Sequence, residues 1–356
     1  MKRLSAKQKA TQQRLAKKRW LRRLRRRLKP HGIPEIILSP PAILSFRENY
    51  DATVAFLDEF RSAILRPGKR REYLTVDLAK VEFISVPAAI VLAAEFHRWQ
   101  IFKSLKLKAK DASKWAPSVS SLLNDLGVFD LLGVRAPLGN EISAENITLT
   151  PLQSGLKLDG AKLNRLQTRF RGMIEDFTNN AAVYEGLSEA VENAISHAYP
   201  DGFEPRHPFA GHRWWGAGCI EISTMRLRFF VFDQGAGIPH TLPTADIFEG
   251  VAAWLASQFP GIVHNDTMML RAALEVGRTR THESHRGLGM RRMADVVSGT
   301  SNAYLRIISR RGEIVYDGSG TIESRTHSDS LGGTLIEWCL PADALTFAPK
   351  AEDEDN

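Results

Sequence analysis

Four short segments in the C-terminal half of the chain carry side chains that can bind and act on a phosphate ester. In SEAVENAISHAY, Glu189 and Asn193 lie four residues apart, a spacing that places both side chains on one face of a helix. A carboxylate there can accept a proton from a water that attacks a terminal phosphate, and an amide oxygen can ligate Mg2+. By itself, the pair is more typical of a solvated helix face.

The segment VFDQGAGIP places an acid at the end of an apolar strand. We expect this strand to deliver Asp233 to the mouth of an apolar pocket, where its carboxylate can accept a hydrogen bond from an exocyclic amine. Gly235 and Gly237 then allow backbone conformations and close approaches that a Cβ atom would block. A turn that needs two glycines is the plainer interpretation of this segment.

Two glycines also precede a later helix, in HRGLGMRRMADVV. Gly287 and Gly289 place main-chain N–H groups at the predicted helix start, where they can surround phosphate oxygens. Arg286 can add charge-assisted contacts, and so can Arg291 or Arg292. A lone G-x-G before a helix is a weak signal, so its position after the other two segments is what gives it weight.

The fourth segment, LGGTLIEWCLP, opens a terminal strand with Thr334, whose hydroxyl can reach Asp233 or a water bound to it. In order, the patterns E-x3-N, D-x-G-x-G, G-x-G and G-T resemble the N, G1, G2 and G3 boxes of the GHKL ATPases, between about Ala161 and Pro341. The resemblance implies a mixed sheet backed by helices, with Mg-ATP in a Bergerat-type pocket on the helical side. By residue, it implies the following roles: Glu189 as catalytic base, Asn193 as Mg2+ ligand, Asp233 as adenine-binding acid, Gly235 and Gly237 as the G1 turn, Gly287 and Gly289 as the phosphate loop, and Thr334 as the G3 hydroxyl.

A separate α/β unit precedes these segments. YLTVDLAKVEFIS is typical of a strand, PAAIVLAAEFHRWQIF of a helix, LKLKAK of a further strand and SVSSLLNDLGVFDLLG of a further helix. This order resembles the STAS domains of anti-sigma-factor antagonists. The phosphorylated Ser of that family has no counterpart in Ser85-Val86-Pro87-Ala88; Ser85 is the nearest substitute, although a Ser in this position is usually a helix N-cap.

These elements define the expected organisation. The fold class is α/β: an N-terminal STAS-like α/β domain followed by a C-terminal GHKL (Bergerat) α/β sandwich. The chain divides into a basic tail that is disordered or helical, the STAS-like domain, a linker, the GHKL-like domain and an acidic tail, at 1–34, 35–137, 138–146, 147–345 and 346–356. Residues 238–285, with helix candidates IFEGVAAWLASQF and TMMLRAALEVG, would form the lid over the nucleotide, and this helix pair is more often simple packing than a docking surface.

Charge and hydropathy limit the classes of partner that the chain can have. The net charge of +8 resides in residues 1–34, which hold 14 Lys or Arg and no acid, so the rest of the chain has 48 − 14 = 34 basic against 40 acidic residues. Such a tail can bind nucleic acid or an anionic membrane, or remain a solvated extension. The longest apolar stretch, Ile84 to Ala94, has 11 residues, short of the roughly 18 that span a bilayer, so we expect no transmembrane segment. Without a secretory signal, a cytoplasmic location is expected.

Several functions remain open at this stage. The N-box segment EAVENAISHAY is similar to the N box of anti-sigma-factor serine kinases. We therefore expect an ATP-binding regulatory protein with slow hydrolysis or serine/threonine phosphotransfer in a partner-switching-like role. The alternative is a non-catalytic ATP-sensing adaptor that presents its lid and tail to a protein or nucleic acid. His97 is the weak candidate for a histidine-kinase acceptor, and His207, His212 and Cys219 are too loosely spaced to argue for zinc. The oligomeric state is not indicated.

Overall fold

The computed structural model describes residues 35–65, 73–103, 108–136, 147–168, 181–279 and 289–345. In these residues the chain is a mixed α/β protein whose main sheet is antiparallel. Both tails and the predicted linker lie outside the described residues, as do Arg286 and Gly287.

The first unit, residues 35–136, contains two small parallel sheets and their helices. Strands β1, β3 and β5 form one sheet, and β2 pairs with β4. The elements are β1 (Glu35–Leu38), β2 (Ile43–Leu44), α2 (Tyr50–Leu65), β3 (Tyr73–Val76), β4 (Phe83–Ile84), α3 (Val86–Lys103), β5 (Lys108–Ala109), a 3-10 turn (Ala112–Lys114), α4 (Pro117–Asp125) and α5 (Val128–Leu132).

Two elements expected to be continuous in this unit are interrupted. The strand YLTVDLAKVEFIS divides into β3 and β4, because the Asp77 carboxylate accepts a hydrogen bond from the Ala79 N–H and closes a turn between them. The expected helix from Ser118 divides into α4 and α5 at Gly127, which has a φ of 77°. A left-handed residue cannot continue a right-handed helix, so the chain changes direction there.

The second unit is built on an eight-stranded sheet in the order β12-β11-β10-β13-β9-β8-β6, with β7 also pairing with β8. Every strand pair in it is antiparallel. The strands are β6 (Ile147–Leu149), β7 (Gln153–Gly155), β8 (Trp214–Glu221), β9 (Arg226–Asp233), β10 (Tyr304–Ser309), β11 (Gly312–Asp317), β12 (Ile322–Thr326) and β13 (Thr334–Pro341).

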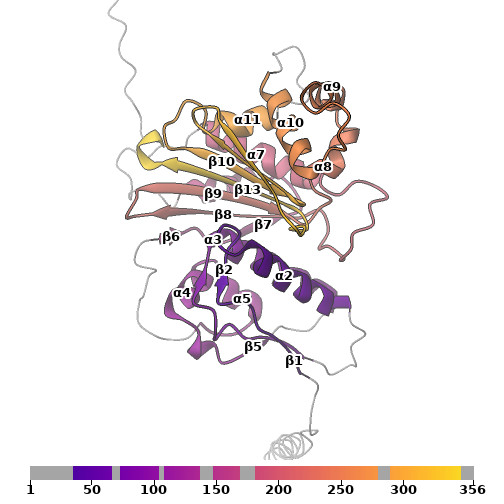
Figure 1. Ribbon diagram of the computed structural model, residues 1–356. Helices are drawn as coiled ribbons and strands as arrows, with labels where there is room; N and C mark the ends of the chain where they lie inside the picture. The colour runs from indigo at the N-terminus through magenta and orange to yellow at the C-terminus, as the bar shows by residue number, and fades with distance from the viewer. Residues whose placement is uncertain are drawn as a thin grey trace, which may run out of the picture.

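Helices cover one face of this sheet, and the first unit covers the other (Figure 1). The chain after β9 contains two longer helices, in the segments where IFEGVAAWLASQF and TMMLRAALEVG predicted them. The helical elements of this unit are α6 (Gly160–Thr168), α7 (Ala181–Ser196), α8 (Ile238–Thr241), a 3-10 turn (Leu242–Thr244), α9 (Phe248–Gln258), α10 (Asp266–Thr279), α11 (Gly289–Asp295) and a final 3-10 turn (Ala342–Leu345).

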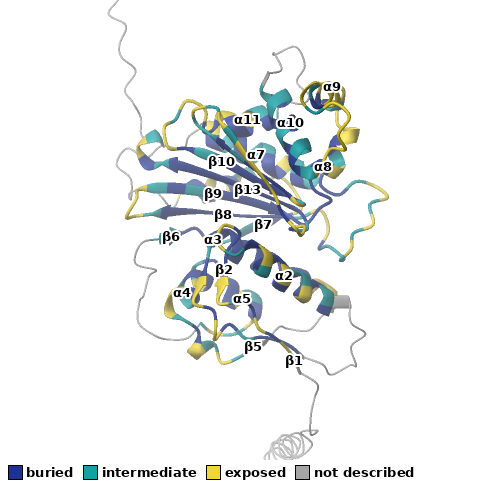
Figure 2. Ribbon diagram, in the orientation of Figure 1, coloured by how far each residue is buried: buried dark blue, intermediate teal, exposed yellow. Residues whose placement is uncertain are grey.

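The central strands are buried on both faces, as the dark ribbons in Figure 2 show. On β9, Phe229 and Val231 pack among the helices, whereas Phe230 and Phe232 pack against the first unit. Side chains alternate between the faces of a strand, so this division explains why LRFFVFD is apolar at consecutive positions.

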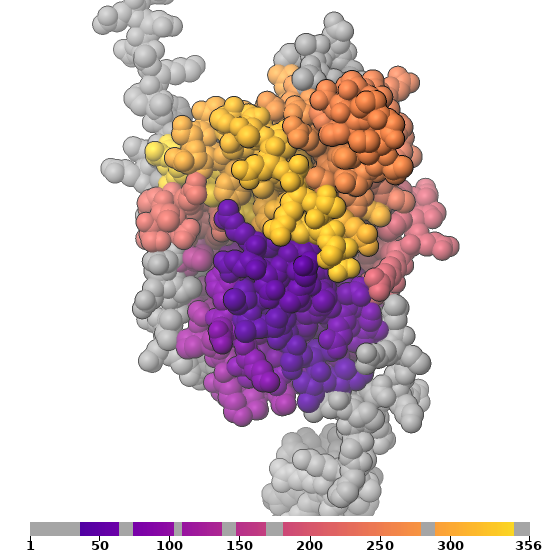
Figure 3. Space-filling view, viewed as in Figure 1, coloured from indigo at the N-terminus to yellow at the C-terminus, as the bar shows by residue number. Residues whose placement is uncertain are grey.

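Helix α3 of the first unit packs against the large sheet. Its residues from Ala88 to Ala94 are at most 3% exposed, and the same core contains Trp215 and Phe230 of the sheet. A helix that is apolar all round must be buried all round, which is the environment that ISVPAAIVLAA requires. Figure 3 shows the first unit in direct contact with the C-terminal part of the chain.

Candidate functional site

Helix α7 brings together the first two predicted site residues. The helix buries Leu187, Ala190 and Val191, while Glu189 and Asn193 are half-buried on an adjacent face. A Cβ atom on Gly289, the first residue of α11, would lie 2.9 Å from Glu189 Oε2 and 3.5 Å from Asn193 Nδ2. The carboxylate, the amide and the start of the helix that follows the predicted phosphate loop therefore meet.

Glu189 already has a cationic partner in this arrangement. Arg292, one turn into α11, forms an ion pair with its carboxylate, and this contact raises the pKa of the Arg292 guanidinium. Arg291 instead lies 3.7 Å from the Asp295 carboxylate on its own helix. Of the three arginines considered as phosphate contacts, Arg286 lies outside the described residues, and Arg292 forms its ion pair with the predicted catalytic base.

Asp233 ends β9 on the helical side of the sheet, because it lies two residues after the helix-facing Val231. Its carboxylate accepts a hydrogen bond of 2.8 Å from the Gly235 N–H and another from the Thr334 N–H. Burial raises the pKa of Asp233 to about 7, and these two donors oppose the shift. A buried acceptor of this kind is suited to an amine donor on a ligand.

The turn after Asp233 needs its two glycines for different reasons. A Cβ atom on Gly235 would lie 2.2 Å from the carbonyl oxygen of Ala198, an impossible contact. Gly237 has a φ of 86°, a conformation that favours glycine. The Ala236 N–H donates to the same Ala198 oxygen at 2.7 Å, so the turn is fastened to the chain that leaves α7.

Thr334 contributes through its backbone rather than through its hydroxyl. It pairs with Asp233 in the β13–β9 register, and its N–H donates to the Asp233 carboxylate. The hydroxyl lies 2.9 Å from Ser309 Oγ, which accepts a hydrogen bond from the Ile238 N–H. The expected hydroxyl contact with Asp233 is therefore replaced by a main-chain contact.

Asp233 with its glycine turn lies at the same end of α7 as the pair Glu189 and Asn193. The Asn193 carbonyl accepts hydrogen bonds from the N–H groups of His197 and Ala198, and Ala198 touches Gly235. The acid at the end of β9 and the Glu-Asn pair are thus joined through one helical turn. Arg286 and Gly287, which would complete the phosphate loop, lie outside the described residues.

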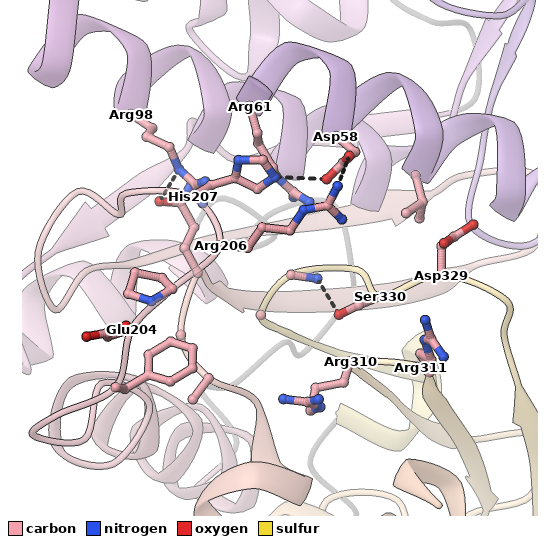
Figure 4. Close-up of a pocket in the computed structure, with 18 of the residues that line it drawn as sticks. Asp58, Arg61, Arg98, Glu204, Arg206, His207, Arg310, Arg311, Asp329 and Ser330 are labelled. Atoms are coloured by element: carbon pink, nitrogen blue, oxygen red, sulfur yellow. Dashed lines mark hydrogen bonds and ion pairs between the residues drawn. The ribbon is translucent and has the colours of Figure 1, made fainter. Parts of the chain in front are cut away.

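A cavity of about 570 Å3 lies on the other side of the same turn, between the two units (Figure 4). Gln234, Gly235 and Ala236 contribute to its wall, but Glu189, Asn193 and Thr334 do not. Sequence reasoning missed this cavity, because its arginines come from separate elements. The one local signal was the pair Arg310-Arg311 between two apolar strands, where a tight hairpin usually has Asn or Gly.

The other sequence candidates have structural partners. Ser85 Oγ accepts a weak hydrogen bond of 3.4 Å from the Ala88 N–H, as a helix N-cap does. His97 packs edge-on against Trp215, and burial lowers its pKa. His207 lies 2.9 Å from an Asp58 oxygen, and His212 stacks on Tyr199. Both cysteines are buried and free: Cys219 and Cys339.

No protein family model matches this chain, and no curated protein matches it with significant similarity. Among the described residues, no helix has the length and apolar character to cross a membrane. The same residues contain no group of three or more His, Cys, Asp or Glu that could hold a metal ion.

Proposed function

We propose that this chain is an ATP-binding regulatory protein with a GHKL-type Mg-ATP pocket in its second unit. The observation that carries the proposal is the buried Asp233 carboxylate at the end of β9, on the face covered by α7, with two backbone donors holding it. The Glu-Asn pair at the same end of α7 supplies the second half of a nucleotide site. Helices on that face of the sheet support the GHKL sandwich, whereas the strand pairs are all antiparallel in place of the mixed sheet that the resemblance implied.

Asp233 would recognise the purine. Its carboxylate would accept a hydrogen bond from the exocyclic amine of adenine, and this bond offsets part of the cost of burying the charged group. Gly235 lets the turn lie against Ala198, which fixes the direction of the carboxylate. The site would prefer adenine to guanine, because guanine has a carbonyl oxygen in place of this amine and the oxygen would face the Asp233 carboxylate, which is also an acceptor.

Asn193 and Glu189 would act at the phosphate end. The Asn193 side-chain oxygen is a suitable ligand for Mg2+, an ion that neutralises charge on the phosphates when bound. Glu189 would orient and deprotonate the attacking water or hydroxyl once Arg292 leaves it. Gly289 keeps the start of α11 close to both side chains, so that main-chain N–H groups can approach the phosphates.

The first unit would serve as a STAS-like structural or sensing partner. Its helix α3 is packed into the same core as the large sheet, so the contact is part of the fold. Chain connection raises the effective concentration of such a contact to about millimolar, which favours a permanent association. This supports a switch in which ATP occupancy is relayed through a fixed interface rather than through binding and release.

The Glu189–Arg292 ion pair favours a second candidate function, a non-catalytic ATP-sensing adaptor. A carboxylate occupied by a guanidinium is not free to contact an attacking water, so ATP could be bound without turnover. The adaptor would act on a protein through the α8–α10 region or the first unit. Nucleic-acid or membrane binding through residues 1–34 stays a prediction, because those residues lie outside the described part of the chain.

Glu189→Ala separates the two candidates. Purified wild-type and variant proteins are incubated with Mg2+ and γ-labelled ATP, and label is followed on water, on the protein itself and on a candidate partner. The regulatory enzyme predicts slow label transfer by the wild type, a loss of about 100-fold or more in the variant, and retained ATP binding. Glu192→Ala, an exposed acid on the same helix, is the matched control. Absence of turnover in the wild type would favour the adaptor.

A further inference from the structure

The cavity between the two units has the size of a small-molecule site. Its volume of about 570 Å3 falls in the range of pockets that enclose metabolite-sized ligands. Its walls are formed by helix α2, the C-terminal half of α3, the loop after α7, the turn after β9, the β10–β11 hairpin and the loop between β12 and β13. It lies on the first-unit side of the turn at Gln234, and Asp233 faces the opposite side of the sheet.

The inner wall contains one cation more than it has anions to balance. Arg61 and Arg98 are both 2% exposed, and both use the same carboxylate, that of the fully buried Glu95. Arg61 Nε donates to Glu95 Oε1 at 2.9 Å, and Arg98 Nε lies 3.3 Å from Glu95 Oε2. Burial of a guanidinium without its own counter-ion is unfavourable, so this wall favours a bound anion.

Arg98 has unused hydrogen-bonding capacity. Its Nε donates to Gln234 Oε1 at 3.0 Å, while its two terminal nitrogens have no hydrogen-bond or ion-pair partner among the described residues. Burial also lowers the pKa of Arg98 to about 10. A guanidinium presents its donors in a planar fork that matches a phosphate or carboxylate, so the free edge of Arg98 is suited to an anionic group.

The opposite wall carries two more arginines on a strained turn. Arg310 and Arg311 form the two-residue connection between β10 and β11, and Arg310 has a φ of 55°. Such a conformation is unfavourable for a residue with a Cβ atom and is often kept where the side chain has a function. Arg310 is paired with Asp266 at 3.2 Å, whereas the Arg311 guanidinium forms no ion pair with any residue that the structure describes.

Carboxylates also line the cavity, and they limit the kind of ligand. Asp58 is already engaged by Arg206 at 3.2 Å and by His207 at 2.9 Å. Glu204 and Asp329 line opposite sides of the cavity, as Figure 4 shows. Each would repel an anionic group placed directly beside it, and each can accept hydrogen bonds from hydroxyl or amino groups of a ligand.

We propose that this cavity binds a small organic phosphate. Arg61 and Arg98 on the inner wall and Arg311 on the hairpin hold the phosphate, and Glu204 and Asp329 accept hydrogen bonds from polar groups on the rest of the ligand. Three independent observations favour a phosphate ligand: the volume of the cavity, the buried arginine that has no carboxylate of its own, and the strained turn at Arg310. The site is separate from the proposed nucleotide pocket.

Inorganic pyrophosphate is the probe, because it presents the anionic group alone. Isothermal titration of the full chain at low ionic strength is expected to show saturable binding. Arg311→Gln should weaken it about tenfold, as loss of one charge-assisted hydrogen bond does, and Arg98→Gln should weaken it at least as much. Arg325→Gln, an exposed arginine on β12 outside the cavity, is the matched control and should bind as the wild type does. Should Arg98→Gln fail to fold, Arg311→Gln decides alone.

Absence of saturable binding would overturn the proposal, and so would equal weakening by Arg311→Gln and Arg325→Gln. Loss of pyrophosphate binding in Asn193→Ala, with both cavity variants unaffected, would place the probe at the phosphate end of the other pocket and also overturn it. ATP is the second probe. ATP binding that is lost in Arg311→Gln and kept in Asp233→Asn would support the anion site and contradict the proposed nucleotide pocket.

Discussion

Asp233 combines a buried carboxylate, two backbone donors and a position at the end of a central strand. The motif predicted that an acid would end this strand, and the structure places it there. Alternation along β9 explains its direction toward α7. The role of Thr334 could not be read from its residue type, because the contact uses an N–H group that almost every residue has.

The raised pKa of Asp233 predicts a specific pH dependence of stability. In the unfolded chain this carboxyl loses its proton near pH 4, whereas in the fold it does so at about pH 7. Between these values the folded state binds more protons, so the free energy of unfolding falls as the pH rises from 4 to 7, by up to about 1.4 kcal/mol per pH unit. Urea unfolding of the wild type and Asp233→Asn across this range measures the effect.

The Asp233→Asn variant should lose most of this fall, because its amide does not titrate. Asp246→Asn, an exposed acid in the segment after β9, should follow the wild-type curve. A wild-type stability that does not decrease relative to Asp233→Asn between pH 4 and 7 would show that the carboxyl is not buried as described.

At the scale of elements, the contact between the end of α7 and the turn after β9 holds the site together. Gly235→Ala should destabilise the protein by about 1–3 kcal/mol and weaken ATP binding, because the added methyl group meets the Ala198 oxygen at 2.2 Å. Gly250→Ala in α9 is the control: its Cβ atom would lie 3.0 Å from Val276 Cγ1, a side-chain atom that can shift, so this variant should lose much less stability than Gly235→Ala and should keep ATP binding. Chemical denaturation and ATP titration measure both effects, and equal behaviour of the two variants would contradict this account.

The elements that sequence reasoning predicted best are those with a strong local pattern. Helix α7 and strands β9 and β13 lie in the segments where the sequence predicted them. Strands β10 to β12 were not predicted. The sequence placed α10 in the expected lid, residues 238–285. In the structure its Leu270 and Leu274 are buried in the core beside α11, so α10 is part of the scaffold.

At the scale of the whole molecule, the large sheet separates two cores that share its strands. Phe229 belongs to the helical core and Phe230 to the core shared with the first unit. We therefore predict one unfolding transition for the full chain. Phe229→Ala and Phe230→Ala should each lower the free energy of unfolding by about 3–5 kcal/mol and shift that same transition.

Calorimetry together with far-ultraviolet circular dichroism tests this prediction. Ile222→Ala, at a residue 49% exposed, is the control and should shift the transition little. Two separable transitions, with Phe230→Ala moving only one of them, would show that the units fold independently.

The sequence predicted an α/β chain with an N-terminal unit and a larger C-terminal unit, but not how they pack. The apolar run Ile84 to Ala94 indicated a buried helix without identifying what covers it. The arginine cavity is a property of this packing, since Arg61, Arg98 and Arg311 come from elements far apart in the chain. Long-range contacts of this kind leave no periodic pattern in a single sequence.

Titration of Mg-ATP into the full chain and into Asp233→Asn tests the central claim most directly. The account predicts that the wild type binds ATP with one-to-one stoichiometry, that Asp233→Asn binds at least tenfold more weakly, and that Asp246→Asn binds as the wild type does. ATP binding that is the same in all three proteins, or absent from the wild type, would contradict it.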